Sequence, residues 1–336
     1  MFRLLQVISK KLTIAIPVFL FLGFAYGLLF NPASLKALVL PLTFIMVYPM
    51  MINLDWSKLL KGRDGKLLAV AQAVNFLVVP VIAFVLGVLF FRHNPYMALG
   101  LFLSSLFPTS GMTITWTGFA KGNVEGAIKM TLVGLTLGSV LSPFYLKFAL
   151  GKVIPIDLVE IFKQIMIVIV IPLSLGALTK AVLVRRYGVA FFKDKIAPKF
   201  PPVSTLGVLG IVFVAMALKA RAIAARPIEL VYALVPVILL YVFNIAFVTA
   251  VARRLFLYED GSVLVFGTVA RNLSIALALA INAFGEKGSN AALVLSAAFI
   301  VQSQAMAWYA KLTQRLLGVK TVPAKVKEEA RIGAET

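Results

Sequence analysis

Long apolar segments recur along the whole chain, and short polar turns separate them. We predict about ten membrane spans, because each segment is long enough to cross about 30 Å of hydrocarbon at about 1.5 Å per residue. The predicted spans are 12–30, 33–53, 67–91, 96–120, 123–149, 159–184, 202–219, 228–252, 261–284 and 289–314. Turn residues such as Asn31-Pro32 and Glu286-Lys287-Gly288 lie between them. The pattern predicts an all-α polytopic membrane protein.

The composition excludes an ordinary soluble domain. Of the 336 residues, 61% are hydrophobic and 14% are charged, whereas soluble domains are about 45–50% apolar and about 25% charged. The chain has no cysteine, which excludes disulfides and thiolate metal sites, and its one histidine, His93, lies in a polar turn. No cluster of acids, histidine or cysteine lies within a predicted span, so we expect neither an enzyme nor a bound metal or cofactor.

The net charge of +20 is better explained by membrane topology than by nucleic-acid binding. Lysine and arginine gather in the N-terminal segment, in the loops after the even-numbered spans and in the last residues of the chain. Cytoplasmic loops carry such an excess, so we expect a multi-pass plasma-membrane protein with both termini in the cytoplasm. Residues 319–336 are predicted to form a cytoplasmic tail. The expected partners are the lipid bilayer and a small solute, without nucleic acid.

Ten spans divide into two sets of five, which we place at residues 1–150 and 151–318. A unit with an odd number of spans inserts its second copy upside down, which predicts the inverted repeats of secondary transporters. A weak local likeness supports this division. Phe119-Ala120-Lys121-Gly122-Asn123 and Phe284-Gly285-Glu286-Lys287-Gly288-Ser289-Asn290 both stand where the fourth span of a half meets the fifth.

Span 96–120 carries signals of an interrupted helix. Pro108 removes a backbone donor and Gly111 weakens the helix near the middle of the span. Thr109, Ser110 and Thr113 place hydroxyls at the same point. We interpret these three as candidate substrate ligands and Pro108 and Gly111 as gating residues. The alternative is that the hydroxyls bond their own helix.

Span 261–284 contains Arg271 about ten residues from its start, near the predicted middle of the membrane. An arginine at that depth costs from about 2.5 to more than 10 kcal/mol and needs a partner. All acidic residues lie at or near loops or span ends, so none is available for a simple buried ion pair. We expect Arg271 to face a watery cavity as a substrate or gating residue, with Asn272 and Ser274 beside it. The alternative is a structural link between two broken helices.

Three further polar residues lie within predicted spans. Lys129 stands roughly 9 Å into its span, where the side chain either snorkels to the interface or takes a secondary gating role. Asn75 and Gln302 are predicted to form hydrogen bonds between helices, and Asn75 is also a candidate secondary or gating residue.

At these positions the chain resembles the arsenite efflux permeases within the bile acid/sodium symporter superfamily, over nearly its whole length. The resemblance implies two inverted five-helix repeats, a panel and a core domain that each draw helices from both repeats, and broken helices 4 and 9 that cross at the substrate site. The resemblance rests mainly on the residues Met46-Val47-Tyr48-Pro49-Met50-Met51, Asn75 with Val79-Pro80, Pro108-Thr109-Ser110-Gly111-Met112, Ile171-Pro172-Leu173 and Arg271-Asn272.

The sequence departs from both branches of this superfamily at the implied site. The arsenite permeases carry a cysteine where this chain has Thr109 and a glutamate where it has Ser274. The sodium-coupled branch has a glutamate and a glutamine where this chain has Gly267 and Arg271. A fixed guanidinium repels a second cation at short range, so we expect no sodium coupling.

The sequence therefore predicts a secondary transporter of a small anionic or oxyanion-like solute that works by alternating access. Within that class, an arsenite or antimonite exporter and an organic-anion carrier are both open. An uncoupled facilitator is the further alternative. The substrate, the coupling ion and the oligomeric state are not predicted.

Overall fold

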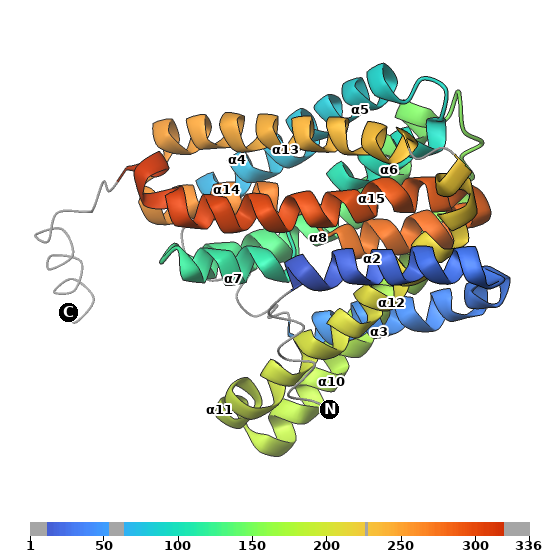
Figure 1. The fold of residues 1–336 in the computed structure, drawn as a ribbon. Coiled ribbons are helices and arrows are strands. Elements are labelled where there is room, and N and C mark those ends of the chain that lie inside the picture. Colours follow the sequence, from blue (N-terminus) through green and yellow to red (C-terminus); the bar gives the residue numbers. More distant parts are fainter. Residues whose placement is uncertain (1–11, 54–63, 226–227, 319–336) are drawn as a thin grey trace, which may run out of the picture.

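The computed structural model describes residues 12–53, 64–225 and 228–318, and these residues are almost entirely helical, without a β-strand (Figure 1). The predicted tail at 319–336 lies outside them. The first elements are α2 (Leu12–Leu29), η1 (Pro32–Leu38), α3 (Val39–Ile52), α4 (Gly65–Ala73), η3 (Val74–Val78), α5 (Val79–Phe90), α6 (Pro95–Leu106), α7 (Gly111–Phe119) and α8 (Val124–Leu150). The remaining elements are α9 (Leu158–Ile165), η4 (Met166–Val170), α10 (Ile171–Tyr187), α11 (Val189–Phe191), η5 (Phe192–Ile196), η6 (Ala197–Lys199), α12 (Phe200–Ala225), α13 (Ile228–Leu255), α14 (Tyr258–Val269) and α15 (Leu273–Leu317).

Within the described residues, seven helical stretches are long and apolar enough to cross a membrane. They are Pro32–Ile52, Gly65–Phe90, Val124–Leu150, Leu158–Tyr187, Val189–Leu218, Val231–Leu255 and Tyr258–Leu317. Ile14–Leu29 and Pro95–Leu106 are shorter apolar helices. The prediction of an all-α protein with several membrane-length helices is confirmed.

Two helical paths are interrupted by short non-helical segments. Residues 107–110 separate α6 from α7, and residues 270–272 separate α14 from α15. The first break includes Pro108, as predicted. A third irregularity lies at Gly285, whose φ of 54° kinks α15. The predicted turn at 286–288 is therefore wrong in position, because those residues are helical and the chain bends at Gly285, which tolerates a positive φ.

The helix that contains Pro80 widens into the π-helical turn η3 just before the proline. A proline leaves the carbonyl four residues earlier without its usual donor. Here that carbonyl belongs to Phe76, and the hydroxyl of Tyr145 on α8 donates to it at 2.5 Å. The bond joins two helices and satisfies the carbonyl.

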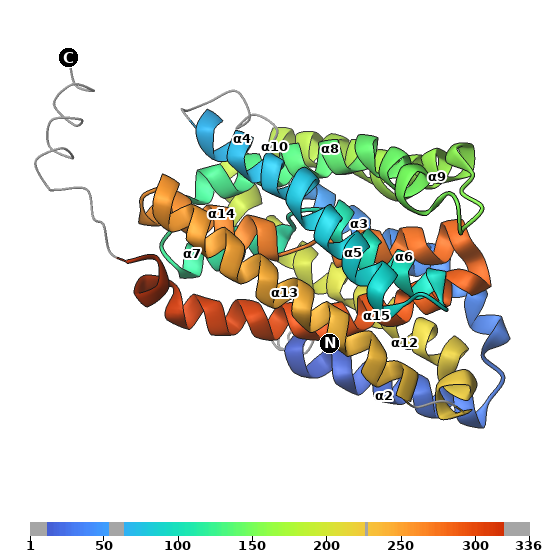
Figure 2. The ribbon, with the colours of Figure 1, turned by 90° about the horizontal axis from the view of Figure 1, so that it is seen from above.

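The helices pack in two groups. In Figure 1, α2, α3, α10 and α12 lie in the lower part of the molecule, where α12 packs against α2 and α3, and α3 packs against α10. The second group includes α5, α6, α8, α13, α14 and α15, and Figures 1 and 2 both show α13 and α15 side by side. The two breaks belong to this second group.

Candidate functional site

The two helix breaks meet in the interior. The backbone N–H of Asn272 donates to the carbonyl of Phe107 over 2.8 Å. Nearby, Arg271 Nη1 donates to the carbonyl of Ser105 at 3.3 Å and Thr113 Oγ1 donates to the carbonyl of Phe266 at 3.5 Å. We call residues 105–113 and 266–275 the crossing. It brings together the residues that the sequence singled out in two distant segments.

A helix begins on each side of the crossing, and each has a side-chain cap. Ser110 caps α7 by accepting from the N–H of Met112, and the Ser110 N–H donates to Thr113 Oγ1 in a capping box. Asn272 caps α15 by accepting from the N–H of Ile275 at 3.3 Å. Helix N-termini carry partial positive charge, so both helices contribute positive potential at the crossing.

All three predicted hydroxyl ligands are buried and bonded to the protein. Thr109 Oγ1 donates to the carbonyls of Pro108 at 2.5 Å and Thr131 at 3.3 Å. Thr109 also has a φ of 64°, a left-handed conformation that costs a β-branched residue about 1–3 kcal/mol. With the bonds of Ser110 and Thr113, this means that the hydroxyls shape the break. Gly111 is the first residue of α7.

Replacing Ser110 with alanine is expected to lower the free energy of unfolding by about 1 kcal/mol, because it removes the cap of α7. Thermal unfolding of the purified protein measures this loss. Ser104→Ala is the matched control, since the one hydrogen bond given for the Ser104 hydroxyl within the described part of the chain is to the carbonyl of Leu101 in its own helix. Impaired solute transport with unchanged stability would instead show that the Ser110 hydroxyl contacts the solute.

Arg271 is buried within the crossing, with only 3% of its surface exposed. The expectation that it faces a watery cavity is therefore wrong for this structure. Its Nη1 binds a carbonyl at the C-terminal end of α6, where carbonyls lack intrahelical partners. Its Nε and Nη2 have no hydrogen-bond partner among the described residues. Arg271 thus links the two broken helices with one nitrogen and leaves two nitrogens unsatisfied.

The backbone of Arg271 is held by a side chain from the far part of α15. Gln302 Oε1 accepts from the Arg271 N–H at 2.8 Å, and Gln302 Nε2 donates to the Arg271 carbonyl at 3.2 Å. The hydroxyl of Tyr241 on α13 donates to the same Gln302 oxygen at 2.7 Å. The predicted role of Gln302 between helices is confirmed. Tyr241 was not predicted, because a tyrosine among apolar residues gives no signal of its own.

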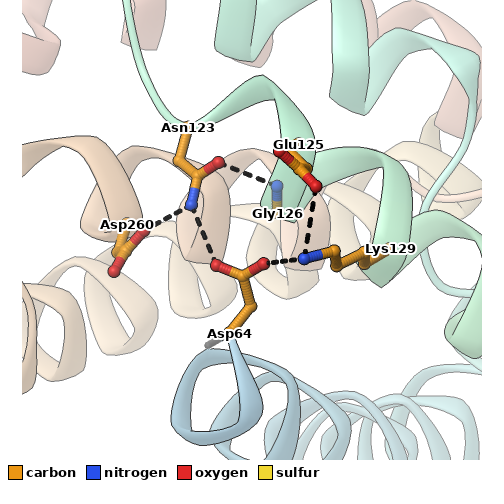
Figure 3. A network of polar contacts seen from close by, with 6 residues as sticks. All are labelled: Asp64, Asn123, Glu125, Gly126, Lys129 and Asp260. Carbon is orange, nitrogen blue, oxygen red and sulfur yellow. Dashed lines mark hydrogen bonds and ion pairs between the residues drawn. The ribbon is translucent and has the colours of Figure 1, made fainter. Parts of the chain in front are cut away.

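Lys129 lies in a different polar network (Figure 3). Its ammonium is 2.5 Å from Asp64 and 3.5 Å from Glu125, and its side chain is 2% exposed. Asn123 Nδ2 donates to Asp64 at 3.1 Å and to Asp260 at 2.9 Å. The network joins the N-terminal ends of α4, α8 and α14. The ammonium of Lys129 thus reaches back to the helix ends, in the direction expected for snorkelling, and pairs there with Asp64, a partner that was not predicted.

The other predicted residues are buried near the breaks or in η3. Asn272 donates from Nδ2 to the sulfur of Met50 on α3 at 4.0 Å, and Ser274 is 7% exposed in the first turn of α15. Asn75 is fully buried in η3, and neither polar atom of its side chain has a hydrogen-bond partner among the described residues. The interhelical hydrogen bond predicted for Asn75 is thus not seen.

Comparison with known proteins identifies a transporter family. Residues 40–226 match the model of the Sodium Bile acid symporter family. The chain is 24% identical over 295 residues to the arsenical-resistance protein Acr3 of Alkaliphilus metalliredigens, covering 82% of this chain and 80% of that protein. It is 22% identical over 303 residues to Acr3 of Corynebacterium glutamicum, covering 82% of each. It is 23% identical over 341 residues to the uncharacterized transporter slr0944 of Synechocystis, covering 90% of this chain and 87% of that protein.

Proposed function

Because this chain belongs to the Sodium Bile acid symporter family, we propose that it is a secondary transporter that carries a small anionic or oxyanion-like solute through the crossing. Arg271 supplies the charge that binds the solute. Thr109, Ser110 and Thr113 shape the unwound segment beside it, and Asn272 and Ser274 lie at the start of the opposing helix. Pro108, Gly111, Asn75 and Lys129 have secondary or gating roles.

The observation that carries this proposal is the buried, incompletely paired guanidinium of Arg271. Two of its nitrogens have no partner among the described residues, and none of its hydrogen bonds or ion pairs with those residues involves a carboxylate. A charge taken out of water without a counter-charge is costly, so an anion gains more here than a neutral solute. The N-termini of α7 and α15 add to this preference.

The proposed architecture has ten spans in two inverted repeats, residues 1–150 and 151–318, with both termini in the cytoplasm of a plasma-membrane protein. Two features support the repeat. Each half contains one broken helix, and each break ends in a polar N-cap, Ser110 or Asn272. The kink at Gly285 also divides the stretch Tyr258–Leu317 into two parts, each longer than the about 20 residues that one crossing needs.

We propose that transport does not depend on sodium. Gly267 offers no carboxylate to hold a cation, and the thioether of Met130 packs against its backbone. Arg271 also brings a positive charge to the crossing, and this charge opposes the binding of a second cation. Uptake is therefore expected to be equal with and without a sodium gradient.

Two solute classes fit this family. The names of the Acr3 relatives describe arsenical resistance, which favours an arsenite or antimonite exporter. The present chain has no cysteine and has Thr109 in the break, which favours an organic-anion carrier. An uncoupled facilitator would carry the same solutes without accumulating them against a gradient.

Uptake into proteoliposomes tests the proposal. Arsenite, antimonite and small carboxylates are offered to vesicles that contain wild type or Arg271→Ala, with Lys163→Ala as the control for loss of an exposed cation. Removing a hydrogen-bonded charge from a buried site is expected to reduce uptake about tenfold or more, whereas the control retains it. Equal uptake by wild type and Arg271→Ala would exclude Arg271 as the anion-binding residue.

A further inference from the structure

The two unsatisfied nitrogens of Arg271 lie on one edge of the guanidinium. In an arginine side chain, the N–H of Nε and one N–H of Nη2 point in the same direction and form a fork. Nη1 lies on the other side of Nε, and it is the atom that donates to the carbonyl of Ser105. The anchoring bond therefore leaves the fork intact. Both fork nitrogens are without a partner in the part of the chain that is described.

The fork is held in a fixed orientation. Gln302 bonds both the N–H and the carbonyl of Arg271, and Tyr241 fixes the oxygen of the Gln302 amide. The Ser105 carbonyl then fixes the far end of the side chain. Holding a binding group in its bound geometry reduces the entropy that a ligand must offset.

The side chains that bond the neighbours of Arg271 bring no competing charge. The sulfur of Met50 accepts from Asn272 Nδ2, and the sulfur of Met112 accepts from Gln302 Nε2 at 3.9 Å. Thioethers are weak hydrogen-bond acceptors and carry no charge. The guanidinium of Arg271 is therefore the group in the crossing that can attract a charged part of a solute.

We infer that the fork of Arg271 binds the carboxylate of a small organic acid through two parallel hydrogen bonds. The inference rests on the proposed anion transport and names its substrate class. A carboxylate has two oxygens in one plane at the spacing of the fork, so it satisfies both nitrogens at once. A spherical halide does not match the fork, and uncharged arsenous acid leaves the guanidinium without a counter-charge. Since Arg271 is 3% exposed, the acid binds when the crossing opens.

A binding screen tests this inference separately from transport. Purified wild type is titrated with sodium acetate, butyrate, benzoate and succinate, and with sodium chloride at equal ionic strength, while thermal stabilisation is measured. At least one carboxylate is expected to stabilise the protein, and chloride is not. This comparison needs no variant, so it holds even where a substitution impairs folding.

Arg271→Lys separates charge from geometry. Lysine keeps the positive charge but has no planar fork, so carboxylate affinity is expected to fall about tenfold or more. Equal stabilisation by chloride and carboxylates, or full carboxylate affinity in Arg271→Lys, would overturn the fork while leaving anion transport intact. No stabilisation by any of the four carboxylates would also overturn it. Arg271-independent uptake of every solute would instead overturn the proposed function.

Discussion

Replacing Lys129 with methionine is expected to lower the free energy of unfolding by about 1–3 kcal/mol, because it leaves the largely buried carboxylate of Asp64, whose side chain is 16% exposed, without its cation. Asp64 lies 2.5 Å from the ammonium and also accepts from Asn123, so it stays in place when the lysine is lost. Thermal or denaturant unfolding of the purified protein measures the change. Methionine keeps most of the side-chain volume, so the loss of stability measures the contribution of the lysine charge.

The matched control is Lys163→Met. Lys163 lies 3.7 Å from Glu160 on the surface, and its side chain is 64% exposed. Exposed pairs contribute about 0–1 kcal/mol, so this variant should unfold almost like wild type. The double variant Lys129→Met with Asp64→Asn should recover part of the loss, because no buried charge then remains unpaired. Equal stability of Lys129→Met and Lys163→Met would show that the buried pair contributes nothing measurable.

Sequence reasoning located the first break and the unusual arginine because their signals are local, whereas the break beside Arg271 was implied by the family resemblance. Pro108 and Gly111 change the backbone at their own positions, and Arg271 stands out in an apolar segment whatever its neighbours are. The roles of the hydroxyls were harder to predict. Thr109 and Ser110 bond backbone groups close by, which competes with solute binding and depends on the local φ and ψ angles.

The pairings across the fold could not be predicted, because they join residues far apart in the sequence. Asp64 reaches Lys129 from a turn 65 residues away, and Gln302 reaches Arg271 from 31 residues away. Taken alone, Asp64 suggests a solvated turn, Lys129 a snorkelling cation and Gln302 a polar contact between helices. Only the packing of α4, α8 and α15 decides which groups meet.

The hydrogen bonds at the two ends of α7 explain why the crossing is well defined. At its C-terminal end, the Tyr258 hydroxyl donates to the carbonyl of Ala120 at 2.7 Å, and the Asn123 N–H donates to the carbonyl of Glu259 at 3.2 Å. At its N-terminal end, Thr113 bonds the carbonyl of Phe266 near the end of α14. Since α7 and α14 are joined at both ends, we expect them to move together when the solute site changes its access.

The group formed by α2, α3, α10 and α12 depends on small residues for its packing. Ser204 and Gly207 stand three residues apart on α12, and both face Met46 on α3. The Ser204 hydroxyl donates to the Met46 carbonyl. A β-carbon added at Gly207 would lie 2.5 Å from the Met46 Cα. Small residues allow such close approach of helix backbones in membranes, where van der Waals packing drives association.

Gly207→Leu is therefore expected to cost at least about 3 kcal/mol, because α12 and α3 must separate to admit the side chain. Leucine is a better helix former than glycine, so a loss of stability in this variant is due to packing and not to helix propensity. Gly118→Leu is the control, since Gly118 is exposed and a β-carbon there meets only Val124 Cγ2 at 3.9 Å. Size-exclusion profiles and melting temperatures should show Gly207→Leu poorly folded and Gly118→Leu close to wild type. Similar profiles for the two variants would contradict the close approach of α12 to α3.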